Sequence, residues 1–335
     1  MIYIMMNKMM KFNFFLMYFC MFLLLLIDNY MIKWIIYEFS MILMISMLNI
    51  MKNSTKMVSI LYYSISSLSS IMFMFFLIIN NYFNLYFNLN SKFLMNFFML
   101  MLFMKMSMFP FHHWMIFCYE KSSWKQIFYL STIMKFIPIM FFCHFMNFWL
   151  NLFILLILNS IFMSIYINVN FSLKKLFACS TSFNNILLIY MYMVNIKQFF
   201  LFMIMYSIIL YFIMELLYMY NFSKLYIIFN YNILNYLFKL WVLIYSMLPL
   251  MLSFMLKWNF LYEMMKFNKF ILYLYLLYLL SSLLLMWKYL VVFKKYMYMN
   301  NNYIYLKVNK KMNLFFFMFM MMFIFLFIIY NFLNN

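Results

Sequence analysis

Long apolar runs separated by short polar breaks recur from one end of the chain to the other. A helix needs about 20 residues to cross the hydrocarbon core of a bilayer, and about eleven runs satisfy that length. They lie near 10–28, 32–50, 58–79, 93–110, 124–146, 149–168, 175–194, 198–220, 234–256, 269–290 and 313–332. A run such as YFCMFLLLLI (18–27) lacks the alternation that a transmembrane β-strand needs. The pattern therefore predicts an all-α, polytopic membrane helix bundle of about eleven transmembrane helices.

Composition strengthens this prediction. The 335 residues are 71% hydrophobic and only 9% charged, more apolar surface than a soluble core can bury. The chain has no glycine and no arginine, and it is rich in residues of A/T-rich codons (Phe, Tyr, Met, Ile, Asn and Lys). We interpret this as the mutational bias of a small organelle or endosymbiont genome, so a methionine stripe is expected to face lipid. No soluble domain interrupts the spans, and we expect residues 1–335 to form a single membrane domain.

Two further features exclude other classes of protein. The N-terminus has a basic start and an apolar run without a small-residue cleavage site, so we expect a first spanning helix that is retained. The four cysteines are widely scattered without C-x-x-C spacing, which argues against a disulfide framework or a zinc site.

The lysines sort into two groups when the predicted loops are assigned to alternate sides. Five lie on the side opposite the N-terminus: Lys33, Lys92, Lys197, Lys266 and Lys269. Fifteen lie on the N-terminal side: Lys8, Lys11, Lys52, Lys56, Lys121, Lys125, Lys174, Lys175, Lys224, Lys288, Lys294, Lys295, Lys307, Lys310 and Lys311. The positive-inside rule then places the N-terminus in the cytoplasm-equivalent compartment. The net charge of +19 is interpreted as this orientation signal, with attraction to anionic lipids as a second effect and no need for nucleic-acid binding.

Four lysines are not assigned to loops and lie inside or at the end of predicted spans: Lys105, Lys135, Lys239 and Lys257. A charge at that depth costs about 2.5–3.5 kcal/mol on insertion scales, which favours a functional role. The alternative is that the side chain lies along the lipid and its ammonium reaches the headgroups. That alternative applies best to Lys239 and Lys257, near the ends of their span.

The prolines point to the same helices. The chain has only three, Pro110, Pro138 and Pro249, each within eight residues of an intramembrane lysine. A proline inside a helix removes one backbone hydrogen bond and frees the carbonyl four residues back. Such a break is tolerated at membrane depth where it is buried in protein or lines a hydrated cavity. We therefore expect broken helices near Pro110 and Pro249 and a polar path through the bundle, with chance placement as the alternative.

Two acidic residues also lie inside predicted spans. Glu38 is deep in the second span and Glu215 is inside the eighth. A lone glutamate in lipid would be protonated, whereas pairing with a lysine from another helix would keep both charged. Glu38 is therefore a candidate partner for an intramembrane lysine, and Glu215 is expected to pair locally with a loop lysine such as Lys224.

Five motifs, in order, resemble a known family over roughly residues 30–260. They read WIIYEFS (34–40), MKMSMFPFHHW (104–114), STIMKFIPI (131–139), NFSLKKLFACSTSFNN (170–185) and SMLPLMLSFMLKW (246–258). They are similar to the family patterns W-x-x-x-E, M-K-x-G-x-x-P-F-H-F-W, T-W-Q-K-x-x-P, N-Q-x-x-x-R-K-x-x-A-Y-S-S-x-x-H and G-G-L-P-P-x-x-G-F-x-x-K-W. The family is NADH dehydrogenase subunit 2, the antiporter-like membrane subunits of respiratory complex I.

The resemblance implies a role for each charged residue that matches. Glu38 would pair with the first central lysine, Lys105. Lys135 would be the bridging lysine, and Lys257 the lysine that leads to the exit side. Weakening the Glu38 pair would favour loss of the proton from Lys105 and its movement towards Lys135 and Lys257.

Further positions match the family less completely. His112 and Lys175 match, and a metal site at the adjacent histidines is not expected because neighbours on a helix cannot both face one ion. The motif glycines are replaced, at three positions by Ser107, Ser246 and Ser253. Other departures are His113 for an aromatic residue, Lys174 for an arginine, Leu250 for a proline and the absence of the motif histidine near Asn184.

The resemblance implies a proton-translocating subunit of complex I in the mitochondrial inner membrane, with its N-terminus in the matrix. Its partners would be other membrane subunits and lipids. The chain has no nucleotide fingerprint, iron–sulfur cysteine set or haem pair, so NADH, FMN, iron–sulfur clusters and ubiquinone are expected in other subunits. Two alternatives remain: a stand-alone cation/proton antiporter, and a structural membrane subunit that does not pump.

Overall fold

A computed structural model describes residues 2–50, 56–86, 91–144, 150–169, 172–219, 245, 252–266 and 269–298. All regular secondary structure in these ranges is α-helical, as the apolar runs predict. The helices are α1 (Ile2–Leu26), α2 (Tyr30–Ile50), α3 (Lys56–Tyr86), α4 (Ser91–Met106), α5 (His113–Lys121), α6 (Trp124–Ser131), α7 (Ile133–His144), α8 (Leu150–Val169), α9 (Leu173–Val194), α10 (Ile196–Met219), α12 (Leu252–Met265) and α13 (Lys269–Tyr298).

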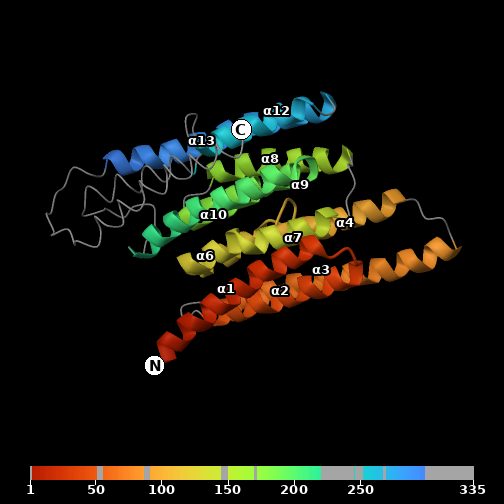
Figure 1. The fold of residues 1–335 in the computed structure, drawn as a ribbon. Coiled ribbons are helices and arrows are strands. Elements are labelled where there is room, and N and C mark those ends of the chain that lie inside the picture. The colour runs from red at the N-terminus through yellow and green to blue at the C-terminus, as the bar shows by residue number, and fades with distance from the viewer. Residues whose placement is uncertain are drawn as a thin grey trace.

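The helices lie side by side in one elongated bundle (Figure 1). Helices α1, α2 and α3 form one side, and α12 and α13 form the other. Between them, α7 packs against α1, α2, α4 and α9, and α9 packs in turn against α5, α8, α10 and α12. Helices α7 and α9 are therefore at the centre of the bundle, where a polar path through the protein would have to run.

The described residues contain seven helical segments long and apolar enough to cross a membrane, and two shorter apolar ones. The predicted span 313–332 and most of 234–256 lie outside the described residues, so the count of about eleven stays a prediction. Several boundaries differ from the predicted spans, among them the end of α3 at Tyr86 and the end of α13 at Tyr298. A short helix, α5, occupies 113–121, between two predicted spans, and α12 continues to Met265 where the predicted span ends at 256.

Helix α9 shows why polar residues are found at the centre. Its buried positions include the small or polar residues Ser180, Thr181, Ser182, Asn184 and Asn185. The three hydroxyl groups donate hydrogen bonds of 2.7–3.0 Å to the carbonyl three residues back, which satisfies them within the helix. Small side chains let neighbouring helices approach closely in a membrane, where apolar burial gives little drive for association.

Two hydrogen bonds join helical segments that the lysine distribution assigns to the same side of the membrane. The Gln126 side-chain amide donates to the carbonyl of Leu48 at 3.0 Å, joining the start of α6 to the end of α2. The Lys288 ammonium donates to the carbonyl of Asn168 at 2.6 Å, joining α13 to the end of α8. The lysine distribution predicts that all four segments lie on the N-terminal side of the membrane. The structure brings the two members of each pair to one end of the bundle.

Candidate functional site

The segment 107–112 interrupts the helical path between α4 and α5. Ser107 has φ 56°, and among the described residues it is the one non-glycine with positive φ. The next residue, Met108, donates its N–H to the carbonyl of Phe103 at 2.9 Å, five residues back, and the α-helical pattern ends there. The Phe109–Pro110 peptide is cis. The predicted break near Pro110 is therefore present, and Ser107 occupies the left-handed position that the family pattern gives to glycine.

Side chains from elsewhere satisfy the backbone groups that this break frees. The N–H of Phe109 donates to Asn159 Oδ1 of α8 at 2.8 Å. The indole N–H of Trp114 donates to the carbonyl of Met104 at 3.1 Å, which joins the start of α5 to the end of α4. Irregular backbone at membrane depth persists only where such partners exist. The break is therefore stabilised by hydrogen bonds from α8 and α5 inside the bundle.

Lys135 of α7 is bound directly to the broken turn. Its side chain is fully buried, and Nζ donates to the carbonyl of Met106 at 2.6 Å and to Ser107 Oγ at 2.8 Å. The same carbonyl accepts a hydrogen bond of 3.0 Å from Asn185 Nδ2 of α9. Hydrogen bonds from a charged donor are about twice as strong as neutral ones. Lys135 therefore joins the interrupted helix to the centre of the bundle.

The interruption next to Lys135 is not at its proline. Helix α7 runs without interruption through Pro138. The path bends instead between α6 and α7, at Thr132, whose φ of −109° and ψ of −88° are not helical. The helical path is therefore interrupted three residues before this lysine and continues through the proline three residues after it.

Lys105 of α4 and Glu38 of α2 come from helices that both pack against α3 and α7, but the two side chains do not touch. Lys105 is 2% exposed, and its Nζ has no hydrogen-bond partner among the described residues. Glu38 Oε1 is buried and has no hydrogen-bond partner there either. The two side chains lie close enough for their charges to interact, yet no N–O distance of 4.0 Å or less joins them. The expected pair is an electrostatic one without a direct ion-pair contact.

Lys105 also interacts electrostatically with Lys135 of α7. Two ammonium groups in one dry interior disfavour each other's charged form, whereas the Glu38 carboxylate favours it. The protonation of Lys105 therefore depends on both neighbours. The structure brings together these three of the predicted site residues.

Lys257 lies on the far side of α9. It is 3% exposed, in the middle of α12 rather than near the end of a span, and its Nζ lies 5.2 Å from the ring centre of Tyr278 and 5.9 Å from that of Phe183. Phe183 and Asn185 of α9 are two residues apart, so they point to opposite faces of that helix. Helix α9 thus separates Lys257 from Lys135. Lys239 and Pro249 lie outside the described residues.

The two adjacent histidines differ in environment. His112 is 8% exposed, its Nδ1 has no hydrogen-bond partner among the described residues, and its ring meets that of Tyr166 edge-on at 5.2 Å. His113 is exposed. Within the described part of the chain no group of three or more His, Cys, Asp or Glu side chains could hold a metal ion. His112 lies at the end of the broken turn, directly before α5.

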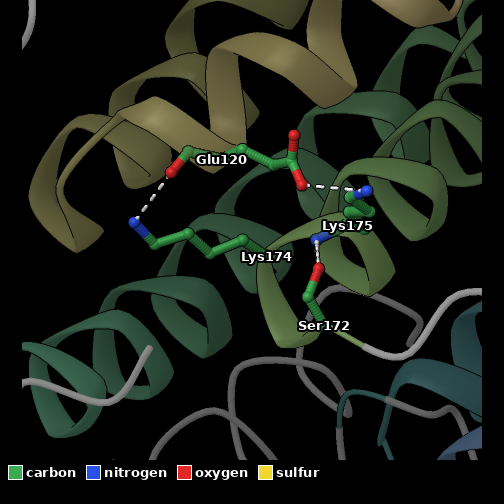
Figure 2. Close-up of polar contacts among 4 residues, drawn as sticks. All are labelled: Glu120, Ser172, Lys174 and Lys175. Carbon is green, nitrogen blue, oxygen red and sulfur yellow. Dashed lines mark hydrogen bonds and ion pairs between the residues drawn. The ribbon is translucent and has the colours of Figure 1, made fainter. Parts of the chain in front are cut away.

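Lys175 forms an ion pair at the N-terminal end of α9 (Figure 2). Its Nζ is 2.9 Å from Glu120 Oε1 of α5, while Lys174 donates to the carbonyl of Ser122 at 2.6 Å. The Ser172 side chain caps α9 by accepting from the backbone N–H of Lys175 at 3.4 Å. About a third of each ion-pair side chain is exposed, so the pair contributes little to stability. Lys175 therefore lies at one end of the bundle, away from Lys105.

Sequence reasoning missed several residues that form the site. Asn185, Asn159 and Ser107 hold the broken turn, and Tyr37 and Tyr62 lie against Lys105. The two asparagines carried a usable signal, because an amide inside an apolar span needs a buried partner. The tyrosines carried none, since aromatic residues make up 26% of the chain.

Comparison with known proteins gives one curated relative and a set of structural neighbours. The chain is 40% identical over 292 residues to "NADH-ubiquinone oxidoreductase chain 2" of Apis mellifera ligustica, covering 85% of this chain and 86% of the relative. A chain of respiratory complex I from Thermus thermophilus with bound aureothin has a TM-score of 0.66 at 14% identity, covering 82% of this chain and 67% of that one. A chain of the membrane-bound sulfane sulfur reductase, an archaeal respiratory membrane complex, has a TM-score of 0.68 at 12% identity, covering 90% and 69%. No protein-family model matches the chain.

Proposed function

Because the chain belongs to the family of NADH-ubiquinone oxidoreductase chain 2, we propose that it is a proton-translocating membrane subunit of respiratory complex I. The observation that carries the proposal is the series of buried lysines Lys105, Lys135 and Lys257, contributed by α4, α7 and α12. Burying three ammonium groups in a membrane is costly, and intramembrane charges of this kind mark proton relays.

The relay uses the differences between the three lysines. Lys105 holds its proton against the charge of Glu38, and a weakening of that interaction favours release. The N–H bond at Lys105 then breaks, and the proton is accepted by the neutral amine of Lys135, which must first have passed its own proton towards Lys257. Mutual repulsion of the first two ammonium groups prevents both from staying charged without Glu38.

The broken turn is what makes Lys135 a suitable acceptor. In the charged form its ammonium donates to Met106 O and Ser107 Oγ, which lowers the cost of the charge in the interior. Lys135 can therefore hold a proton without a carboxylate beside it. The step from Lys135 to Lys257 has to pass α9, whose buried Ser, Thr and Asn side chains are the polar groups on that route.

The remaining properties follow from the same proposal. The protein is a multi-pass membrane protein, and we place it in the mitochondrial inner membrane with its N-terminus in the matrix, in agreement with the lysine distribution. Its partners are the other membrane subunits and the surrounding lipids. NADH, FMN, the iron–sulfur clusters and ubiquinone are proposed to bind other subunits of the oxidoreductase.

Replacing Glu38 with glutamine tests the proposal. The variant keeps the size of the side chain but removes the charge that holds the proton on Lys105, so proton translocation per NADH oxidised should fall by the share of this subunit. The measurement uses assembled complex in vesicles, and a native gel of the same sample confirms assembly.

The same experiment separates the rivals. A stand-alone cation/proton antiporter would migrate apart from the large complex on the native gel. A purely structural subunit would be found in the complex with an unchanged ratio of protons to NADH.

A further inference from the structure

Lys105 differs from Lys135 in how its ammonium is held. Lys135 Nζ has two hydrogen bonds, whereas Lys105 Nζ has none among the described residues. What lies against Lys105 is the face of two aromatic rings, at 4.7 Å from the ring centre of Tyr62 and 5.6 Å from that of Tyr37. A cation over an aromatic face within about 6 Å is attracted by the ring, and most strongly where water is excluded.

Both rings are held in place by other contacts. Tyr37 of α2 is stacked on Phe141 of α7, with ring centres 4.5 Å apart and planes inclined by 10°. The Tyr62 hydroxyl of α3 contacts Met41 Sδ of α2 at 2.9 Å. Both tyrosines are 0–1% exposed. Two helices therefore present rigid π faces to a lysine of a third helix.

We propose that Tyr37 and Tyr62 are positioning residues that hold the Lys105 ammonium in place of a direct ion pair with Glu38. This inference rests on the proposed function. The two rings would set how readily Lys105 releases its proton, which is the first step of the proposed relay. The rings attract the charged form alone, so the proton stays on Lys105 while Glu38 remains near but unbonded. A ring has no proton-accepting atom on its face, so it stabilises the charge without taking the proton.

Among the described residues, the charges that act on Lys105 are Glu38 of α2 and Lys135 of α7, next to the two tyrosines of α2 and α3. Glu38 favours the ammonium and Lys135 opposes it. Removing a ring takes away attraction to the ammonium but none to the neutral amine. Lys105 then loses its proton at lower pH.

The test is the pH profile of proton translocation per NADH oxidised in assembled complex. In Tyr62→Leu, and to a lesser extent in Tyr37→Leu, the fall of this ratio at alkaline pH should begin about one pH unit lower, the size expected for a desolvated cation–π contact. Tyr62→Phe keeps the ring and should leave the profile unchanged. Phe76→Leu is the matched control, since it removes a buried ring of α3 that stacks on Phe97 of α4.

The outcomes separate this inference from the proposed function. If Tyr62→Leu and Tyr37→Leu both have the profile of Phe76→Leu while Lys105→Met loses translocation, the relay stands and the aromatic positioning is wrong. A shifted profile in Tyr62→Phe would also contradict it, because the hydroxyl rather than the ring would then be responsible. If Lys105→Met keeps the full ratio, the proposed function fails and the positioning role fails with it.

Discussion

Replacement of Lys135 with methionine should abolish the share of proton translocation that this subunit contributes, the largest effect we expect from any single substitution. Methionine fills a similar volume, but it can neither carry a proton nor donate to Met106 O and Ser107 Oγ. The variant therefore removes both the acceptor of the Lys105 proton and the tie between α7 and the broken turn. The measurement is protons translocated per NADH oxidised by the assembled complex.

A matched control separates loss of the relay from loss of any lysine. Lys197 is exposed near the start of α10, far along the chain from the broken turn, so Lys197→Met should leave the ratio unchanged. Because the ratio is normalised to NADH oxidation, a fall in the amount of assembled complex does not imitate the effect. A Lys135→Met complex that translocates the full number of protons would contradict the role of Lys135.

Replacement of Ser107 with valine should destabilise the broken turn by roughly 1–3 kcal/mol and lower translocation as well. Ser107 has φ 56°, and a β-branched side chain is strongly disfavoured in that region. Valine also lacks the hydroxyl that accepts from Lys135. The measurement is the temperature at which the assembled complex loses NADH-driven translocation, and valine should lower it.

Two further variants separate the backbone from the hydroxyl. Ser107→Ala removes the hydrogen bonds of the hydroxyl with Lys135 Nζ and Met106 O, and Ser107→Gly removes them while relieving the left-handed backbone, worth roughly 1–2 kcal/mol. Glycine should therefore be more stable than alanine, and valine the least stable of the three. Equal stability of the three variants would show that the positive φ is not a constraint at this position.

The sequence was sufficient to predict the class of fold and most of the charged residues that are buried in the bundle. Hydrophobic run lengths follow from bilayer thickness, and a buried lysine is conspicuous because its burial is costly. The break near Pro110 was also predictable, since proline cannot continue the backbone hydrogen bonding of a helix. Lys105, Lys135 and Lys257 are all buried.

What the sequence did not predict depends on contacts between segments far apart in the chain. The bend beside Lys135 is at Thr132 rather than at Pro138, because a proline can be accommodated in a helix that its neighbours enclose. Lys257 is central in α12, although the hydropathy window ended its span one residue earlier. The sequence could not indicate which aromatic rings lie against Lys105, because aromatic residues make up 26% of the chain.

The distance between Glu38 and Lys105 was the least predictable feature of all. The resemblance implies a pair, yet no direct ion pair joins them, and two tyrosines stand against the ammonium instead. A charge that is held by π faces and by a carboxylate beyond contact distance responds to small movements of either. In the proposed relay, that arrangement would allow Lys105 to release its proton.

The most direct test of the relay is proton translocation per NADH oxidised in assembled complex that carries Lys105→Met. Methionine keeps the buried volume and removes the only group at this position that can carry a proton. We expect the ratio to fall by the share of this subunit while NADH oxidation continues. An unchanged ratio would contradict the relay and leave the buried lysines as structural features of the bundle.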